Sequence, residues 1–309
     1  MKKKTVSFII PCYNSEKTIG NVVNEIKTSL KNQYNYEIIL VNDGSKDYTY
    51  DVICNLAEND TRIKVIDFSK NFGQHSALLT GLRYAVGNII VCLDDDGQTP
   101  AIDSIKLIKE IEKGNDVVFA KYSDKKHGLL RNVGSSINAK MTEIMLNKPK
   151  NIYVSSFFAC KEYIAKEVIK YTNPYPYLLG LLLRSTDKLA NIDVDHRKRE
   201  YGKSGYSIKK LVSLWLNGFT AFSIKPLRIS MIIGFIVSIV GIVFGIIIII
   251  NKITKHINIV GYSSIMASIL FIGGTMMIIL GIVGEYIGRI YISINNSPQS
   301  VIRETRNIK

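Results

Sequence analysis

Three adjacent carboxylates, Asp94, Asp95 and Asp96, follow the apolar run at 89–93. Like charges this close repel one another, so the cluster is costly unless a cation neutralises it. Carboxylate oxygens select hard divalent ions such as Mg²⁺ or Mn²⁺, which often complete their coordination with the phosphates of a substrate. The cluster therefore predicts a metal ion that holds a phosphorylated substrate, and the alternative is a solvated acidic turn.

Other polar residues also follow short apolar runs near the start of the chain: Asn14, Glu16, Asp43 and Asn71. The β-branched residues of these runs predict strands at 6–10, 37–41, 63–68, 89–93 and 117–120. Apolar residues at helical spacing predict helices at 19–30, 48–58, 76–85 and 102–111. Such alternation is typical of an α/β fold with a doubly wound, mostly parallel sheet, whose ligands bind at the carboxyl ends of the strands. We therefore expect the polar residues to meet at one edge.

Missing motifs exclude several other kinds of site. No G-x-G-x-x-G follows the first predicted strand, so the dinucleotide fingerprint is absent. Gly202-Lys203-Ser204 resembles the end of a phosphate-binding loop, but Arg197 stands where that loop needs its first glycine. The four cysteines are far apart in the sequence and form no C-x-x-C pair, so we expect reduced thiols.

Two long apolar segments lie near the end of the chain. Residues 229–250 and 259–284 number 22 and 26 and carry no charge, whereas about 20 apolar residues suffice to cross a membrane. Buried core helices are the alternative, but helices of soluble proteins seldom stay apolar on every face for this length. The short linker at 251–258 predicts a transmembrane hairpin over 229–284, and the glycines of its spans permit a homo-oligomer.

Basic residues flank the hairpin on both sides. The linker of the hairpin carries only Lys252 and Lys255. Four basic residues precede the hairpin and four follow it: Lys209, Lys210, Lys225 and Arg228, then Arg289, Arg303, Arg306 and Lys309. By the positive-inside rule both termini face the cytoplasm, which predicts a multi-pass protein of the cytoplasmic membrane. We expect a cytoplasmic catalytic domain at 1–206, an amphipathic interfacial helix and linker at 207–228, and a cytoplasmic tail at 285–309. An ordinary core helix is the alternative for the interfacial one.

Charge is distributed unevenly along the chain, whose formal net charge is +14. Residues 1–120 carry a net charge of −2, residues 121–228 of +12 and residues 229–309 of +4. A basic cluster of four residues precedes the predicted interfacial helix: Arg197, Lys198, Arg199 and Lys203. At the depth of the lipid headgroups this cluster would attract an anionic group. The basic residues adjoin the predicted membrane segments and contain no recognisable nucleic-acid-binding motif. We therefore expect membrane lipids as partners and no nucleic acid.

Four segments resemble successive motifs of family 2 glycosyltransferases with the GT-A fold: 6–14, 41–45, 71–73 and 94–98. With its terminal hairpin the chain is more similar to the polyprenyl-phosphate glycosyltransferases, the group of dolichyl-phosphate mannose synthase and bactoprenol glucosyltransferase. The resemblance implies metal-dependent, inverting transfer of a hexose from a nucleotide sugar to polyprenyl (undecaprenyl) phosphate, for the modification of cell-envelope glycans. Glucose from UDP-glucose is the expected donor group, with mannose, galactose, N-acetylhexosamine or an aminoarabinose derivative as alternatives.

The resemblance, together with the basic cluster, also implies roles for individual residues. The nucleotide-sugar pocket would contain Pro11, Tyr13, Asn14, Glu16, Asp43, Asp94 and Asp95. The D-x-D-x-Q pattern implies the metal ligands Asp94, Asp96 and Gln98. The acceptor phosphate would meet Arg131, Arg197, Arg199, Lys203 and Ser204. Catalytic roles are expected for Asp94, Asp95, Asp96, Arg131 and Arg199.

The sequence departs from the family pattern before an F-x-L stretch, where Ser155 and Ser156 replace a common Asp. No other residue is an obvious general base, and Asp95 is the remaining candidate for that role. A phosphate acceptor needs none, since a phosphate monoester is mostly dianionic at pH 7. A processive polysaccharide synthase is disfavoured because the single tryptophan, Trp215, lacks the Q-x-x-R-W motif. A non-enzymatic membrane scaffold is disfavoured by the intact acidic motif.

Overall fold

The computed structural model describes residues 4–30, 33–122, 143, 148–174, 176–195, 197, 225–254, 261–295 and 297–308. The chain divides into two compact units. The first unit combines Met1–Gly205 with Asn296–Lys309, and the second is Tyr206–Asn295. Because the first unit contains both chain ends, the chain leaves it and later returns to it.

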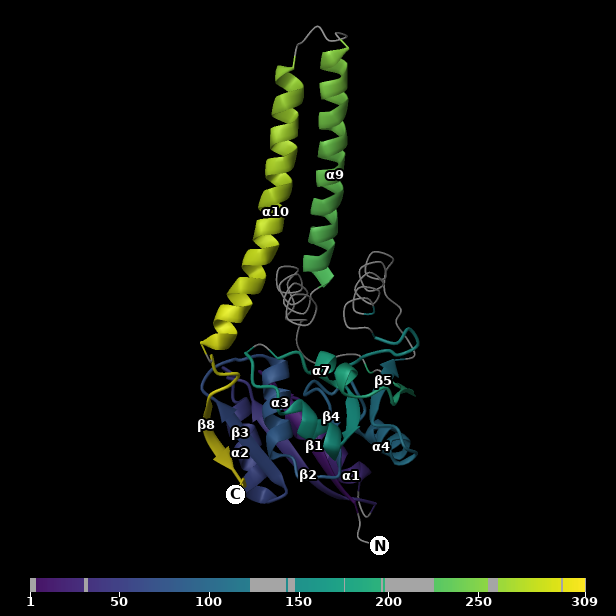
Figure 1. Ribbon diagram of the computed structural model, residues 1–309. Helices are drawn as coiled ribbons and strands as arrows, with labels where there is room; N and C mark the ends of the chain where they lie inside the picture. Colours follow the sequence, from purple (N-terminus) through teal and green to yellow (C-terminus); the bar gives the residue numbers. More distant parts are fainter. Residues whose placement is uncertain are drawn as a thin grey trace. The chain divides into compact units, whose positions relative to one another are not determined.

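The first unit is built on an eight-stranded sheet with the order β7-β5-β6-β4-β1-β2-β3-β8 (Figure 1). Its strands are β1 (Thr5–Cys12), β2 (Asn35–Asn42), β3 (Ile63–Phe68), β4 (Ile89–Cys92), β5 (Val117–Tyr122), β6 (Phe158–Lys161), β7 (Leu189–Val194) and β8 (Ile302–Arg306). The central strands β4, β1, β2 and β3 are parallel, as are β5 and β7. β6 runs antiparallel between β4 and β5, and β8 runs antiparallel to β3. The expected mostly parallel α/β sheet is confirmed.

Helices cover both faces of this sheet. They are α1 (Ile19–Ser29), α2 (Thr49–Asn59), α3 (Gln74–Tyr84), α4 (Ser104–Glu112), α6 (Glu162–Val168) and α7 (Leu178–Ser185). α1, α2 and α4 contribute to one hydrophobic cluster, and α3, α6 and α7 to another. Successive side chains of a strand point to opposite faces, so Phe8 and Ile10 of β1 belong to the first cluster and Ile9 to the second.

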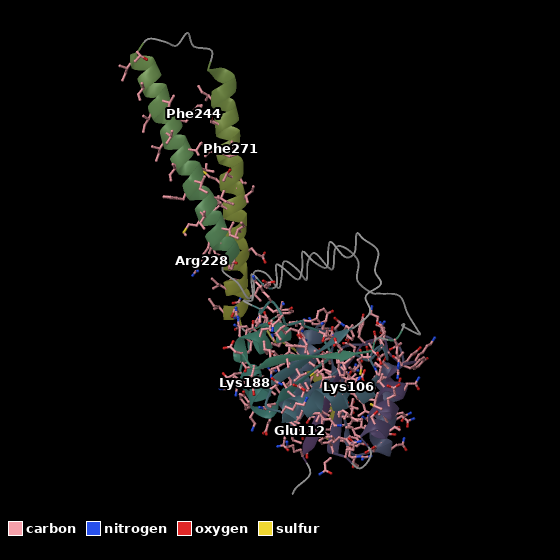
Figure 2. The ribbon with its side chains drawn as sticks, turned by 90° about the vertical axis from the view of Figure 1, so that its right-hand side faces the viewer. Lys106, Glu112, Lys188, Arg228, Phe244 and Phe271 are labelled. Carbon is pink, nitrogen blue, oxygen red and sulfur yellow. The ribbon has the colours of Figure 1, made fainter. Side chains whose placement is uncertain are left out.

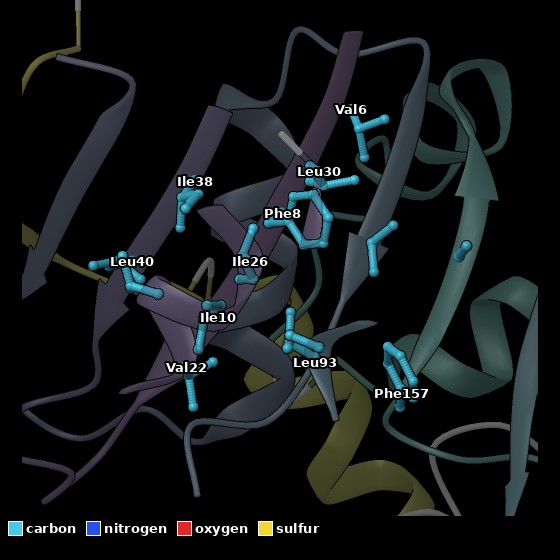
Figure 3. Packing of buried hydrophobic residues seen from close by; sticks show 14 of the residues in the cluster. Val6, Phe8, Ile10, Val22, Ile26, Leu30, Ile38, Leu40, Leu93 and Phe157 are labelled. Atoms are coloured by element: carbon cyan, nitrogen blue, oxygen red, sulfur yellow. The ribbon is translucent and has the colours of Figure 1, made fainter. Parts of the chain in front are cut away.

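The first cluster shows how the spacing of apolar residues fixes a helix on the sheet. In α1, Ile19, Val22, Val23 and Ile26 recur at helical spacing and are all buried. Figure 3 shows side chains of this helix beside Phe8 and Ile10 of β1. The predicted strands and helices of the first 120 residues lie within a few residues of those in the structure.

The second unit contains α9 (Lys225–Ile253) and α10 (Tyr262–Ile294). Both are long and apolar enough to cross a membrane, over Leu227–Ile247 and Phe271–Ile294. At most 6% of either apolar window is buried in the protein, unlike the core helices considered as the alternative. Figure 2 shows their side chains, with Phe244 and Phe271 labelled, projecting outward and carrying few polar atoms. The expected interfacial helix at 207–228 lies almost wholly outside the described residues.

The segment after α10 differs from the expected tail. Residues 302–306 form β8 and extend the sheet of the first unit, where β8 lies at the edge beside β3 (Figure 1). The Ser69 N–H also donates to the Val301 carbonyl at 2.9 Å. The physical reason is that the edge of β3 offers unpaired backbone groups, and a short strand from far along the chain satisfies them.

Candidate active site

The acidic motif lies where β4 ends and turns back toward β1. The Tyr13 N–H, directly after β1, donates to Asp95 Oδ2 at 2.9 Å. Burial raises the pKa of Asp95 to about 6, although the Tyr13 N–H opposes the shift; the neighbouring charges of Asp94 and Asp96 act in the same direction as burial. The Asp95 side chain therefore links the segment after β4 to the segment after β1, the neighbouring parallel strand.

Asp94 is oriented by side chains from two other elements. Gln74, the first residue of α3, donates from Nε2 to Asp94 Oδ1 at 2.7 Å. Ser156, just before β6, donates from Oγ to Oδ2 at 2.6 Å. Both donors are neutral, so they fix the carboxylate without cancelling its negative charge.

The rest of the D-x-D-x-Q pattern forms a tight turn beside residue 197. The Gln98 N–H donates to Asp96 Oδ1 at 3.0 Å. The Gln98 carbonyl accepts the Arg197 N–H at 2.8 Å, and Gln98 Nε2 lies 3.5 Å from the Arg197 carbonyl. The Arg197 guanidinium forms an ion pair with Glu25 of α1. The backbone of the predicted basic cluster thus begins next to the acidic motif.

The turns after β1 and β2 hold each other in place. Asn14 adopts a left-handed conformation with φ 53°. Its N–H donates to Ser45 Oγ at 3.1 Å, and its Oδ1 accepts the Lys46 N–H at 2.9 Å. Glu16 Oε2 likewise accepts the Tyr48 N–H at 3.0 Å. These reciprocal hydrogen bonds make the two predicted nucleotide-binding turns one connected surface.

Asp43, at the end of β2, binds the loop that follows β3. Its carboxylate accepts the N–H groups of Phe72 and Gly73 at 2.7 and 2.9 Å, and Asn71 Nδ2 at 3.0 Å. Burial raises the pKa of Asp43 to about 6, while the two backbone N–H groups act in the opposite direction. Gly44 is necessary here: its φ is +65°, and an added Cβ would lie 2.5 Å from the Asn71 nitrogen.

The carboxylates of Asp94 and Asp96 fit a hard divalent cation by the chemistry of their oxygens. Within the described ranges, no group of three or more His, Cys, Asp or Glu side chains is arranged to hold a metal ion. A cation at these two carboxylates would therefore need oxygen atoms from a substrate or from water to complete its coordination. That need matches the way Mg²⁺ is usually bound, through one or two carboxylates and substrate phosphates.

The structure brings together part of the predicted site. Hydrogen bonds link the turn after β1 both to Asp95, after β4, and to the turn after β2. The predicted residues that lie just after these three neighbouring strands are Tyr13, Asn14, Glu16, Asp43, Asp94, Asp95 and Asp96. Pro11 is buried within β1, where it pairs in register with Val41. The remaining acceptor-phosphate residues lie outside the described part of the chain: Arg131, Arg199, Lys203 and Ser204.

Sequence reasoning missed Gln74 and Ser156 as partners of Asp94. Gln74 directly follows the 71–73 motif and begins a helix beside the strand ends. This position in the sequence could have indicated that Gln74 belongs to the site. Ser156 was visible only as the residue that replaces a family acid. Its contact depends on β6 pairing with β4, and that antiparallel strand was not predicted.

Comparison with protein-family models gives two matches. Residues 7–169 match the model described as glycosyl transferase family 2. Residues 225–290 match the GtrB C-terminal hairpin. Together the two matches cover most of the sheet unit, from β1 through β6, and most of the two long apolar helices.

Curated relatives match over almost the full length. The prophage bactoprenol glucosyl transferase homolog of Escherichia coli (strain K12) is 32% identical over 310 residues, with 97% of this chain and 99% of the relative covered. The undecaprenyl-phosphate 4-deoxy-4-formamido-L-arabinose transferase of Photorhabdus laumondii is 28% identical, with 97% and 94% covered.

Solved structures show the same fold. Glucosyl-3-phosphoglycerate synthase from Mycobacterium tuberculosis, solved with Mn²⁺, UDP and glucosyl-3-phosphoglycerate, aligns with a TM-score of 0.55 at 18% identity. The alignment covers 69% of this chain and 76% of that one, and the expected GT-A architecture is confirmed. By its family match and its relatives, the chain belongs to glycosyl transferase family 2 and is a glycosyltransferase.

Proposed function

We propose that the chain transfers a hexose from a nucleotide sugar to polyprenyl phosphate at the cytoplasmic face of a membrane, with glucose from UDP-glucose as the first donor to test. The observation that carries the proposal is the meeting of Asp43, Asp95 and the Asn14 turn at the carboxyl ends of adjacent parallel strands. This is where such sheets bind ligands. Relatives of about 30% identity named for bactoprenol or undecaprenyl phosphate support the acceptor class.

The donor diphosphate is assigned to the acidic motif. Asp94 and Asp96 would hold Mg²⁺ or Mn²⁺, with Gln98 as a third candidate ligand. A bound divalent cation would stabilise the diphosphate as negative charge develops on it. Gln74 and Ser156 keep Asp94 in one orientation. The turns after β1 and β2, which hydrogen bonds link to each other, would form the wall of the pocket that holds the nucleoside.

The acceptor chemistry needs no dedicated base. An alcohol acceptor must lose a proton as it attacks, whereas a phosphate monoester is mostly dianionic at pH 7 and is already nucleophilic. A phosphate oxygen attacks the anomeric carbon, the bond to the diphosphate breaks, and the anomeric configuration inverts. The enzyme must bring two anions together, a task suited to the basic residues of 121–228, with Arg131, Arg197, Arg199, Lys203 and Ser204 as candidates.

The path of the chain supports a membrane hairpin with both ends on one side. The chain leaves the sheet unit after Gly205 and returns to it at Asn296. A chain that returns to the same folded unit crosses a membrane an even number of times. The described residues between these points include two helices of sufficient length. Two crossings would keep the sheet unit and both termini on the same side, and the flanking basic residues favour the cytoplasm.

The test is transfer by the purified full-length chain with Mg²⁺ or Mn²⁺. A panel of UDP-glucose, UDP-galactose, UDP-N-acetylglucosamine and GDP-mannose is offered with undecaprenyl phosphate or with undecaprenol. We expect one donor to label the phosphate and not the alcohol, and chelation by EDTA to stop the reaction. Equal labelling of both lipids would overturn the acceptor, and undiminished transfer in EDTA would overturn the metal.

A further inference from the structure

The segment that follows α10 is fastened to the sheet unit by side chains as well as by β8. Gln299 is buried and accepts a hydrogen bond from Arg83 of α3 at 2.6 Å, while its Nε2 donates to the carbonyls of Tyr171 and Asn173. Asn307 Nδ2 donates to two further carbonyl groups. These contacts fix the position of the strand between them.

One contact of β8 reaches a buried charge. The Asp67 side chain in β3 is fully buried, and the Arg303 Nε donates to its Oδ2 at 2.5 Å. Asn42, at the end of β2, donates from Nδ2 to Asp67 Oδ1 at 2.7 Å. A buried carboxylate is costly unless it is paired and hydrogen-bonded, so Arg303 makes this arrangement of Asp67 and Asn42 favourable.

Asn42 leads directly to the turn assigned to the nucleotide. Because its Nδ2 is engaged by Asp67, its Oδ1 faces the other way and accepts the Ser45 N–H at 3.3 Å. Ser45 Oγ in turn accepts the Asn14 N–H at 3.1 Å. The side chains thus form an unbroken path from Arg303 through Asp67 and Asn42 to the turns after β1 and β2.

We propose that Arg303 is a positioning residue for donor binding: through Asp67 and Asn42 it fixes the turn at 42–46, and so links the segment after the membrane hairpin to the nucleotide pocket. The donor assignment rests on the proposed function. The link itself rests on hydrogen bonds between described residues of one compact unit. Arg303 has no role in the transfer step, because it acts on the pocket through two other side chains.

Arg306 provides a matched control on the same strand. It forms ion pairs with Glu58 at 3.4 Å and Glu304 at 3.1 Å, and both carboxylates are substantially exposed. Replacing it therefore removes one arginine of β8 without leaving a buried charge unpaired. The Arg303→Lys variant is the conservative counterpart, since it keeps a cation beside Asp67.

The first measurement is hydrogen–deuterium exchange of the full-length protein in detergent, which needs no substrate. We expect Arg303→Ala to speed exchange in peptides covering 42–49, and Arg306→Ala to leave those peptides unchanged. The Arg303→Lys variant should restore most of the protection. Faster exchange confined to β3 and β8 would overturn the proposal, as would equal effects of the two alanine variants.

The second measurement is steady-state kinetics with the donor that the wild type uses. We expect Arg303→Ala to raise the donor KM about 2- to 30-fold, the range for side chains that carry coupling between sites. The KM for the lipid and kcat should change less than about twofold, which a general loss of folding would not produce. A change in kcat alone would overturn the positioning role. If the wild type transfers nothing, the proposed function fails while the exchange experiment still decides the link.

Discussion

At the scale of single residues, the most informative contact is the pair of neutral donors on Asp94. Hydrogen bonds to a carboxylate hold its orientation, but a glutamine amide and a serine hydroxyl leave its negative charge available to a cation. Partners of this kind commonly set metal affinity, since changing them weakens binding about 10- to 100-fold. Gln74 and Ser156 are thus expected to matter for metal binding although neither is a predicted ligand.

The Ser156→Ala variant tests this role. Removing its hydroxyl leaves Asp94 Oδ2 without that donor, so we expect the Mn²⁺ concentration for half-maximal activity to rise about 10-fold. Activity at saturating metal should recover to near the wild-type value. The measurement is a titration of initial rate against free Mn²⁺.

Ser155→Ala is the matched control for that titration. Ser155 is the adjacent serine, and its Oγ donates to the carbonyls of Ala120 and Phe157 rather than to Asp94. It should lower thermal stability without shifting the metal requirement. A shift of the same size in both variants would show that the effect comes from the fold around β6 and not from Asp94.

At the scale of elements, α3 must lie very close to β1 for Gln74 to reach Asp94. Gly81 makes this approach possible, because a Cβ at that position would lie 2.4 Å from Ile9 Cγ2 and 3.4 Å from Val41 Cγ2. Ile9 is β-branched and fully buried, so it has little freedom to move aside. A side chain at Gly81 would push the helix away from the sheet.

We therefore expect Gly81→Ala to destabilise the sheet unit by about 1–3 kcal/mol, as overpacking of a core usually does. Activity should fall with it, because α3 also carries Gln74. Gly20→Ala in α1 is the control: nothing lies within 4 Å of its added Cβ, and alanine is the better helix former by up to about 1 kcal/mol. Thermal unfolding of both variants in detergent gives the comparison, and a Gly81→Ala variant as stable as the wild type would contradict the prediction.

The sequence alone predicted the sheet elements of the first 120 residues but not those that follow them. Helical and β-branched patterns located β1 to β5 and the helices between them, because each is a continuous buried run or an amphipathic face. The sequence analysis did not predict β6, β7 or β8, and β8, with Arg303 and Glu304 in its centre, lacks the apolar character of a strand. These strands pair with segments that are distant in the sequence. The contacts of Ser156, just before β6, and of Arg303, in β8, could therefore not be predicted. The site was predictable where motifs follow a strand, and not where strand pairing supplies the contact.

At the scale of the whole molecule, β8 allows the proposed membrane orientation of α9 and α10 to be tested. The four native cysteines are buried in the structure and should give little background labelling: Cys12, Cys54, Cys92 and Cys160. A cysteine introduced at Thr254, an exposed position just after α9, reports on the end of that apolar helix that faces the 255–260 linker. Cysteines at Val86 and Val301, which are 68% and 42% exposed, report on the sheet unit and on the segment before β8.

Spheroplasts that carry each variant are treated with a maleimide that cannot cross membranes. We expect Thr254→Cys to be labelled in intact spheroplasts, and Val86→Cys and Val301→Cys only after the membrane is permeabilised. The last two must agree, because Val301 accepts a backbone hydrogen bond from Ser69 and its segment leads into β8. Labelling of Val301→Cys but not Val86→Cys from outside would mean that β8 does not pair within this sheet, and labelling of both would place the sheet unit outside the cell. If Thr254→Cys were protected together with the other two, the apolar helices would not cross the membrane, although their length and composition allow it.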